Sequence, residues 1–426
     1  MKLADRNLGM DRPISRRDLL LGMGATAASA FVPGQAFADE MLRLEAGGES
    51  YYPPALTGLR GSHVGSFEVA HQLAREGQRN WGSVTEPDTD LYDLVVVGGG
   101  VSGLSAAYFY RQAYPDARIL ILDNHDDFGG HAKRNEFQLA GRTLMTHGGS
   151  ELLEGPENYS GIAKGLFDDL GIQPQRLGEA YDFDFYRKNG LTAGVYFDRE
   201  TFGVDRTLAY PLVTSWHYQG WISVAESRLS HEEAVRQMPI SDAAKREMMR
   251  LLTTRKNAIP EHSFATDDAY LNSISYRDFL SRHMKMEEPE IYTIFENLTT
   301  DWCVGIEAVP AMEAFYWGLP GINATRLEGP GGWFGSGSEM TPTYHFPDGN
   351  ASVARMLVRS LIPNVAPGNT IEEVVLAPFD YTKLDRANSN VRVRLRSTAV
   401  DVQHDGSPKK SRRVGVTYVR GENANR

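Results

Sequence analysis

The stretch LYDLVVVGGGVSGLSAA, residues 91–107, decides the fold of this chain. It opens with an apolar, β-branched run that is typical of a buried parallel strand. Glycines then follow at the spacing G-x-G-x-x-G, and the residues of this fingerprint are Gly98, Gly100, Ser102 and Gly103. In such a turn the first glycine lets the chain reverse, the second lets a pyrophosphate approach the backbone, and the third lets the helix lie close to the strand. The pattern predicts a Rossmann-like dinucleotide-binding domain whose first helix directs its N-terminal N–H groups at the phosphates.

A second strand and an acidic residue complete the β-α-β unit. Residues 118–122 form another largely apolar run, and Asp123 follows it, 25 residues after Gly98. A carboxylate at this strand end can accept hydrogen bonds from both ribose hydroxyls, and it would repel the 2′-phosphate of NADP. The alternative is that Asp123 only caps the end of the strand. Because the β-α-β context surrounds it, we favour the ribose role.

A pair of glycines distinguishes FAD from NAD as the dinucleotide. Gly129 and Gly130 follow closely after Asp123 and Asn124, and the NAD pattern has no such pair. The arrangement resembles the glutathione-reductase-type FAD proteins of the amine-oxidase branch, in which an acid at the strand end precedes a Gly-Gly pair close to the pyrophosphate. This resemblance implies FAD as the cofactor and places these four residues at its binding site.

Three basic residues after the glycine pair are candidates for neutralising the phosphates. The amine-oxidase branch usually has an arginine directly after the pair, whereas this chain has His131. Lys133 and Arg134 lie close by, so the sequence leaves open which of the three meets the phosphates. A solvent-facing position is the alternative for Lys133.

The same resemblance implies roles for residues further along the chain. In the amine-oxidase branch a glycine-rich turn runs past the flavin, and an acidic residue shortly after it lines the substrate tunnel. The matching residues here are Gly148, Gly149, Ser150 and Glu154. Small residues suit a close approach of the backbone to a flat ring, and a buried carboxylate attracts a cationic amine. A place in an ordinary surface turn is the alternative for Glu154.

The run LILDNHDDFGGHAKRNEF, residues 120–137, is more specific than the glycine fingerprint. Together with that fingerprint and an N-terminal export signal, it resembles the bacterial spermidine dehydrogenases and their flavoprotein relatives. The resemblance implies an α/β fold, a Rossmann-like FAD-binding domain of glutathione-reductase type with an inserted α+β substrate domain. It also implies oxidation of a polyamine C–N bond by hydride transfer to the flavin, with hydrolysis of the imine to an aldehyde and an amine. A FAD-dependent oxidoreductase with another substrate and a truncated, non-catalytic fragment are the alternatives.

The first residues of the chain form the export signal. Arg16 and Arg17 precede a mildly apolar run, residues 19–32, that is shorter than the ~20 residues a membrane span needs. Ala36 and Ala38, in the tripeptide Ala-Phe-Ala, are small residues at the two positions that a signal peptidase reads. The pattern resembles the bacterial twin-arginine signals, which implies recognition by the twin-arginine translocase, cleavage after Ala38 and a periplasmic protein. An amphipathic N-terminal helix is the alternative.

Composition excludes several classes of function. The chain has 426 residues and a formal net charge of −11, and binding of nucleic acid is not expected because it needs clusters of Lys and Arg. Cys303 is the single cysteine, so an internal disulfide and a cysteine-based metal site are excluded. We expect no metal and no membrane span. The expected partners are a polyamine or another small amine and an electron acceptor that the sequence does not identify.

Periodicity and capping signals place the remaining elements. Ser230 and Glu233 have the spacing of a capping box. Helices are expected near 230–238, 242–255, 275–284, 306–317 and 351–361. Alternation over residues 391–402 predicts a strand, and residues 414–419 would pair with it as a hairpin. The resemblance implies that Val400 in this strand offers its backbone to adenine. Acids alternate with aromatics over residues 181–186, for which we favour a strand over a cluster that binds ammonium groups.

These signals divide the chain into five parts. They are the signal peptide 1–38, an extension 39–90, a first part of the FAD-binding domain 91–155, a substrate domain 156–345, and a second part of the FAD-binding domain 346–426. The extension is expected to pack on the surface of the enzyme and to contain a short helix near 67–73. Relatives have a closing glycine-aspartate motif that faces the flavin, and its absence here predicts a shortened FAD-binding domain.

Overall fold

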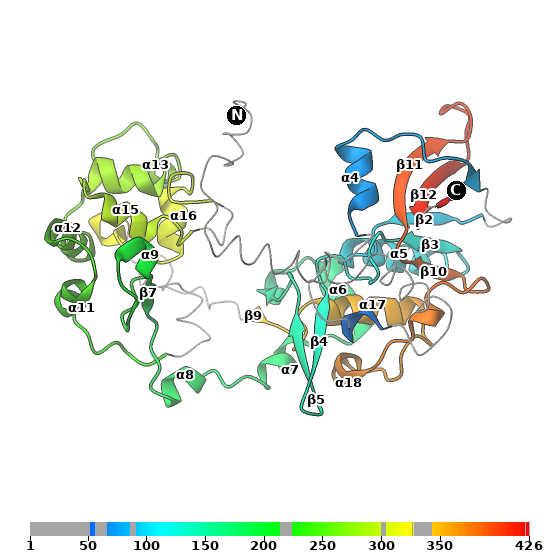
Figure 1. Cartoon of the computed structure of the whole chain (residues 1–426), viewed down its shortest axis with the longest axis horizontal. Helices are drawn as coiled ribbons and strands as arrows, with labels where there is room; N and C mark the ends of the chain where they lie inside the picture. Colours follow the sequence, from blue (N-terminus) through cyan, green and yellow to red (C-terminus); the bar gives the residue numbers. More distant parts are fainter. Residues whose placement is uncertain are drawn as a thin grey trace. The chain divides into compact units, whose positions relative to one another are not determined.

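A computed structural model describes most of the chain after its N-terminal segment. The described residues are 52–55, 66–85, 91–213, 224–299, 304–325, 327, 343–421 and 423–425. The predicted export signal and Cys303 lie outside them. The chain divides into two compact units, whose elements are labelled in Figure 1. The first unit comprises Met1–Leu152, Asp169–Ile172 and His345–Arg426, and the second comprises Leu153–Asp168 and Gln173–Tyr344.

A parallel sheet forms the centre of the first unit. Its strands are β2 (Leu94–Val97), β3 (Ile119–Leu122) and β10 (Val391–Arg394), in the order β10-β3-β2. All four residues of β3 are buried, as expected for a central strand with neighbours on both sides. Helix α5 (Val101–Ala113) connects β2 to β3, so the β-α-β unit expected from the sequence is confirmed.

Helix α5 packs on this sheet, and helices from later parts of the chain pack on α5 and on one another. Helix α17 (Ala351–Leu361) has the predicted bounds and packs against α5. Its polar residues are buried with the apolar ones, among them Arg355 at 2% exposure. Helix α18 (Ile371–Leu376) follows and begins with a capping box. Tyr108 of α5 donates a hydrogen bond to Asp169 at 3.1 Å, which explains why a short piece of chain from the middle of the sequence belongs to this unit.

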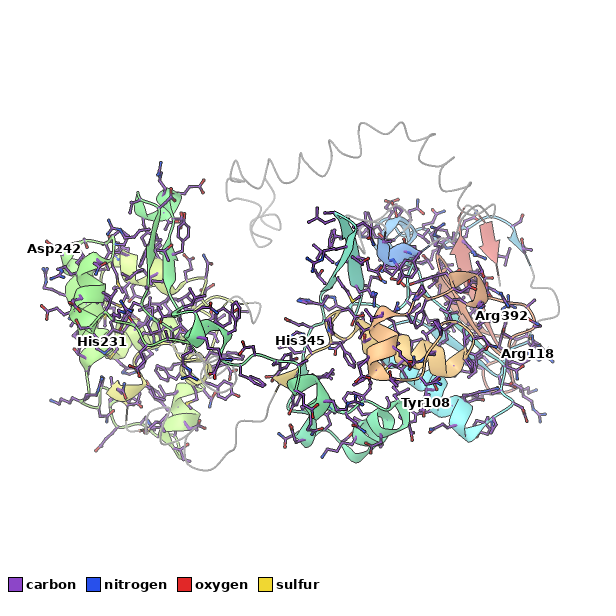
Figure 2. The ribbon with its side chains drawn as sticks, turned by 90° about the horizontal axis from the view of Figure 1, so that it is seen from below. Tyr108, Arg118, His231, Asp242, His345 and Arg392 are labelled. Atoms are coloured by element: carbon purple, nitrogen blue, oxygen red, sulfur yellow. The ribbon has the colours of Figure 1, made fainter. Side chains whose placement is uncertain are left out.

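Two arginines in and beside the sheet are held by neighbouring side chains. Arg392 of β10 donates to Tyr92 at 2.9 Å and to Asp385 at 2.6 Å. The guanidinium of Arg118 lies over the ring of Tyr92, 5.4 Å from its centroid. Figure 2 labels Arg118 and Arg392 within the first unit. Arg392 is buried, and its carboxylate partner compensates for the cost of removing the charge from water.

The expected strand over residues 391–402 is two strands in two different sheets. β10 ends at Arg394, and β11 (Thr398–His404) belongs to a mixed sheet of order β1-β13-β12-β11. The break arises because Arg396 and Ser397 donate their backbone N–H groups to the carbonyls of His125 and Asp123, both at 2.7 Å. The predicted hairpin is confirmed, since β11 pairs antiparallel with β12 (Val414–Arg420).

The predicted N-terminal extension contributes three short elements to the first unit. A 3-10 helix, η1 (Pro53–Ala55), contacts β4 (Arg134–Leu139), which forms a hairpin with β5 (Arg142–His147). Helix α4 (Glu68–Ala74) packs against β11. Strand β1 (Val84–Thr85) pairs in parallel with β13 (Asn423–Asn425). Of the described parts of the extension, β1 is therefore paired into the mixed sheet, while η1 and α4 pack against other elements of the unit.

The second unit is mostly helical, with two short strand pairs. Its helices are α6 (Gly161–Leu170, whose last two residues are assigned to the first unit), α7 (Pro174–Gly178), α8 (Phe185–Lys188), α9 (Arg199–Phe202), α11 (His231–Gln237), α12 (Asp242–Thr253), α13 (Asp267–Leu271), α14 (Tyr276–Asp278), α15 (Pro289–Phe295) and α16 (Ala311–Tyr316). A π-helical turn, Phe279–His283, continues α14. The strand pairs are β6 (Leu153–Glu154) with β9 (Thr343–Tyr344) and β7 (Val195–Phe197) with β8 (Arg206–Leu208). Apolar side chains from these helices, including Phe279, Phe295 and Phe315, form one buried core.

Two predictions for the second unit have opposite outcomes. The capping box at α11 is confirmed, because the side chains of Ser230 and Glu233 each bond the backbone of the other. The strand favoured over residues 181–186 is wrong, since this segment forms turns that lead into α8. Local ion pairs stabilise the turns: Lys188 binds Asp182 at 2.7 Å, and Arg187 binds Asp184 at 2.7 Å. No helix among the described residues is long and apolar enough to cross a membrane.

Candidate dinucleotide-binding site

The glycine fingerprint forms a tight turn between β2 and α5. Gly98 has a φ of +104°, which glycine adopts without strain. A Cβ at Gly103 would lie 2.0 Å from the carbonyl oxygen of Gly98, so only glycine lets the helix approach the strand this closely. Helix α5 begins after Gly100, and no side chain caps it. Ser102 lies in its first turn, where backbone N–H groups and the positive end of the helix dipole suit an anion.

The second glycine turn lies against the first. The N–H of Gly129 donates to the carbonyl of Gly99 at 2.8 Å, and Gly100 and Gly129 form an isolated parallel bridge. A Cβ at Gly130 would lie 3.0 Å from the Cα of Gly100. Two backbones therefore meet without side chains between them, at the carboxyl end of the parallel strands where ligands of such sheets bind. This cradle suits a pyrophosphate.

Asp123 is buried beside this cradle, at 5% exposure. Its Oδ2 accepts the N–H of Gly99 at 2.7 Å, and its Oδ1 accepts the N–H of His125 at 2.8 Å. Each carboxylate oxygen can accept a second hydrogen bond, so both remain competent to meet ribose hydroxyls. The structure thus shows Asp123 holding the glycine turn, and its contact with ribose stays a prediction.

Only one of the three candidate cations faces solvent. Lys133 is buried, and its Nζ donates to the backbone oxygen of Asp127 at 2.8 Å, so the solvent-facing alternative is wrong. Arg134 is also buried and binds Glu136 and, at 3.0 Å, Asp348. His131 is exposed. Among the three, His131 is therefore the one with an exposed side chain, and its contact with a phosphate stays a prediction.

The third glycine segment lies beside His131. A Cβ at Gly149 would lie 2.1 Å from the Cε1 atom of His131, and the N–H of Gly148 donates to the carbonyl of Lys133 at 2.6 Å. Ser150 is held from the other side, because the side chain of Asn350 donates to its Oγ at 2.8 Å. The structure therefore brings Gly148, Gly149 and Ser150 next to the Gly-Gly turn.

Asn124 and Val400 lie at the adenosine end of the expected site. The side-chain amide of Asn124 donates to the backbone oxygen of Ser66. Val400 is buried in β11, at an irregularity in the pairing between Ala399 and Asp401. Since Ser397 bonds the carbonyl of Asp123, the start of β11 is fixed beside the ribose candidate.

A buried polar network behind the Gly-Gly turn was not evident in the sequence. The hydroxyl of Tyr381 donates to Asp127 at 2.5 Å, and the hydroxyl of Tyr52 donates to Glu136 at 2.8 Å. Ser352 donates to Asp348 at 2.6 Å. Burial raises the pKa of Tyr381 well above its ordinary value, and the Asp127 carboxylate raises it further. These residues come from distant parts of the chain, so no local motif indicates them.

Glu154 belongs to the second unit, in the short strand β6. Its side chain is exposed, so the expectation of a buried carboxylate at this position is wrong. Two tyrosines of the same unit respond to its charge. Burial raises the pKa of Tyr159 and the charge of Glu154 raises it further, while a hydrogen bond to the backbone of Glu154 acts in the opposite direction. Burial raises the pKa of Tyr316 as well, followed by the effects of Glu154 and Glu313. An exposed acid with two aromatic side chains in its electrostatic reach can attract an ammonium group, and the two tyrosines had no signal in the sequence.

The geometry of the site and one family model together define the class of fold. The model described as the NAD(P)-binding Rossmann-like domain matches residues 96–170, which contain the fingerprint, Asp123 and the Gly-Gly turn. The chain therefore has a Rossmann-like dinucleotide-binding fold, as the sequence predicted. Among the described residues, no group of three or more His, Cys, Asp or Glu side chains is arranged to hold a metal ion.

Particular relatives match parts of the chain at low sequence identity. The mitochondrial electron transfer flavoprotein-ubiquinone oxidoreductase of Caenorhabditis elegans is 31% identical over 116 residues, 22% of this chain and 18% of its own. The "Probable flavin-containing monoamine oxidase A" of Dictyostelium discoideum is 34% identical over 83 residues, 20% of this chain and 16% of its own. A solved putrescine oxidase with bound putrescine is 14% identical, with a TM-score of 0.31, over 80% of this chain and 57% of its own. The chain thus matches less than a fifth of these curated relatives and just over half of that structure.

Proposed function

We propose that this chain binds FAD in its first unit and oxidises a C–N bond of a small amine, with a polyamine such as spermidine as the substrate class. The observation that carries the proposal is the cradle in which Gly100, Gly129 and Gly130 meet, beside the carboxylate of Asp123. FAD is the dinucleotide that the relatives support, because several of the curated proteins that match stretches of this chain are named as flavin-containing or FAD-dependent enzymes.

The residues around the cradle fit the parts of FAD. The pyrophosphate would lie at the N-terminus of α5, between the two glycine turns, where a Cβ would meet backbone atoms. Asp123 would bind the ribose, and Asn124 and Val400 would border the adenine. His131, with Gly148, Gly149 and Ser150, would border the phosphates and the inner part of the cofactor.

Bound FAD supplies an acceptor for the hydride that leaves the carbon next to the amine nitrogen, and the resulting imine hydrolyses to an aldehyde and an amine. The protein's own part is to bind the amine and to orient it. Glu154, with Tyr159 and Tyr316 near it, is the group that would attract a cationic amine. The acids at 182 and 184 are less suited to this role, because each already pairs with a lysine or arginine.

Export belongs to the same proposal. The twin arginines, the short apolar run and the Ala-Phe-Ala tripeptide at 36–38 support passage through the twin-arginine translocase and a periplasmic location. N-terminal sequencing of protein recovered from the periplasm is expected to begin at Asp39. Recovery from the cytoplasm alone, with Met1 retained, would contradict this part.

The visible absorption spectrum of the purified chain tests the cofactor. The two bands of oxidised flavin are expected, and a colourless protein that takes up no added FAD would contradict the proposal. Anaerobic addition of spermidine to the flavin-loaded protein tests the substrate, since the bands should bleach. A simple monoamine and an amino acid serve as controls. Bleaching by these and not by spermidine would leave a flavin oxidoreductase with another substrate.

A further inference from the structure

Residues 66–74 of the N-terminal extension border the adenosine end of the candidate site at two points. The backbone oxygen of Ser66, which is 2% exposed, accepts the side-chain amide of Asn124, the residue directly after Asp123. Helix α4, which begins at Glu68, packs against β11, the strand that contains Val400; the two elements are labelled side by side in Figure 1. The extension is therefore fixed between the ribose candidate and the adenine candidate.

Phe67 lies at this junction with its ring in solvent. It is 42% exposed, although Ser66 beside it is buried. Large aromatic side chains are usually placed inside, and small polar residues outside, so this arrangement is the reverse of what burial alone favours. The ring of His71, one turn along α4, lies 5.0 Å from the ring of Phe67 at a tilt of 40° and restricts its orientation.

The same residue is a poor start for a helix. Phe67 occupies the N-cap of α4, with no side-chain hydrogen bond to the first turn. Ser, Thr, Asp or Asn at this position would accept a backbone N–H, and a phenyl ring cannot. Neither burial nor capping therefore accounts for an aromatic residue at position 67, and its exposed ring remains available to a flat ring from outside the chain.

We infer that Phe67, oriented by His71, is a stacking surface for the adenine of the bound dinucleotide, and that the N-terminal extension forms one wall of the cofactor site. This inference rests on the proposed binding of FAD. Base-aromatic stacking tolerates the identity of the base and is strong enough to change affinity by about tenfold or more. Its contribution is confined to ligands that contain adenine.

The experiment measures the affinity of the flavin-free chain for FAD, ADP and FMN. Phe67→Ala and Phe67→Leu are expected to weaken FAD and ADP by about tenfold and to leave FMN within twofold. Phe67→Trp should restore both adenine ligands. Phe137→Ala is the matched control, because Phe137 is also exposed, at 38%, in β4 of the same unit; it should change none of the three affinities.

Each pattern of results decides the inference. Equal affinities of wild type and Phe67→Leu for ADP overturn it, even if Phe67→Ala proves unstable in urea. An equal loss for FAD and FMN also overturns it, because it indicates a structural effect on the whole site. If the unaltered chain binds neither FAD nor ADP, both the proposed function and the inference about Phe67 are wrong. If it binds both tightly and substitutions at residue 67 change nothing, only the inference about Phe67 is wrong.

Discussion

The Oδ2 atom of Asp123 accepts a hydrogen bond from the backbone N–H of Gly99 at a distance of 2.7 Å. The bond joins the end of β3 to the middle of the glycine fingerprint, so the acid fixes the turn that would receive the pyrophosphate. A Cβ at Gly99 would lie 3.1 Å from the same oxygen, which explains why position 99, between two glycines of the fingerprint, is also glycine. The residue expected to bind ribose thus has a second task within the fold.

Asp123→Asn is expected to weaken FAD binding by about thirtyfold, because a charged acceptor of hydrogen bonds is replaced by a group with one acceptor oxygen. Titration of the flavin-free protein with FAD measures the effect. Asp93→Asn is the matched control, since Asp93 also accepts a backbone N–H, from Arg118 at 2.7 Å, at the opposite end of the same strands. Similar losses in both variants would show that Asp123 acts only through the fold.

Gly103→Ala should destabilise the first unit by about 3 kcal/mol or more, because the added Cβ would lie 2.0 Å from a backbone oxygen that cannot move aside. Urea unfolding followed by circular dichroism measures the change. Gly165→Ala is the control, since Gly165 lies within α6 and a Cβ there would meet nothing within 4 Å. It should be neutral or stabilise by up to about 1 kcal/mol, through higher helix propensity. A tolerated alanine at 103 would contradict the close packing of α5 on β2.

The sequence predicted those parts of the structure that depend on neighbouring residues. The two strands and the helix of the β-α-β unit, the capping box at Ser230 and the bounds of α17 follow from local periodicity and local hydrogen bonds. The strand break after Arg394 was missed, because Ser397 bonds a carbonyl at Asp123, far away in the sequence. The bond from Tyr381 to Asp127 spans 254 residues and has no local signal at all.

The sequence named the basic residues of the candidate site but could not distinguish them, for a similar reason. In the sequence, the three basic residues after the Gly-Gly pair are equivalent candidates. In the structure they differ in burial. Lys133 is 5% exposed and Arg134 is 3% exposed, each with partners in the protein, while His131 is exposed. Burial and pairing depend on residues such as Asp348, more than two hundred positions later, so only the folded chain distinguishes the three.

Tyr381→Phe should lower the free energy of unfolding by about 1–3 kcal/mol at neutral pH, because the buried Asp127 carboxylate loses a hydrogen-bond donor. The pH dependence supplies a second readout. Burial and the Asp127 carboxylate raise the pKa of Tyr381 in the folded state. The protonated hydroxyl therefore contributes its full share of the free energy of unfolding at any pH below the pKa of an unfolded tyrosine, about 10. Above that pH the wild type should lose stability more steeply than the variant. Parallel profiles between pH 9 and 11 would contradict a protonated, hydrogen-bonded Tyr381.

Glu154→Gln is expected to raise KM for spermidine by about tenfold and to change kcat little, because the carboxylate would attract the ammonium group without touching the reacting carbon. Steady-state kinetics with an artificial electron acceptor measure both constants. Glu157→Gln is the control: Glu157 is a nearby exposed acid of the same unit, in the 3-10 helix Pro156–Asn158, and should leave KM within twofold. Added salt should raise KM for the wild type and have less effect on Glu154→Gln, because screening weakens only the attraction that the variant has already lost. An unchanged KM in Glu154→Gln would contradict binding of the substrate amine by Glu154, which would then be an ordinary surface residue of β6.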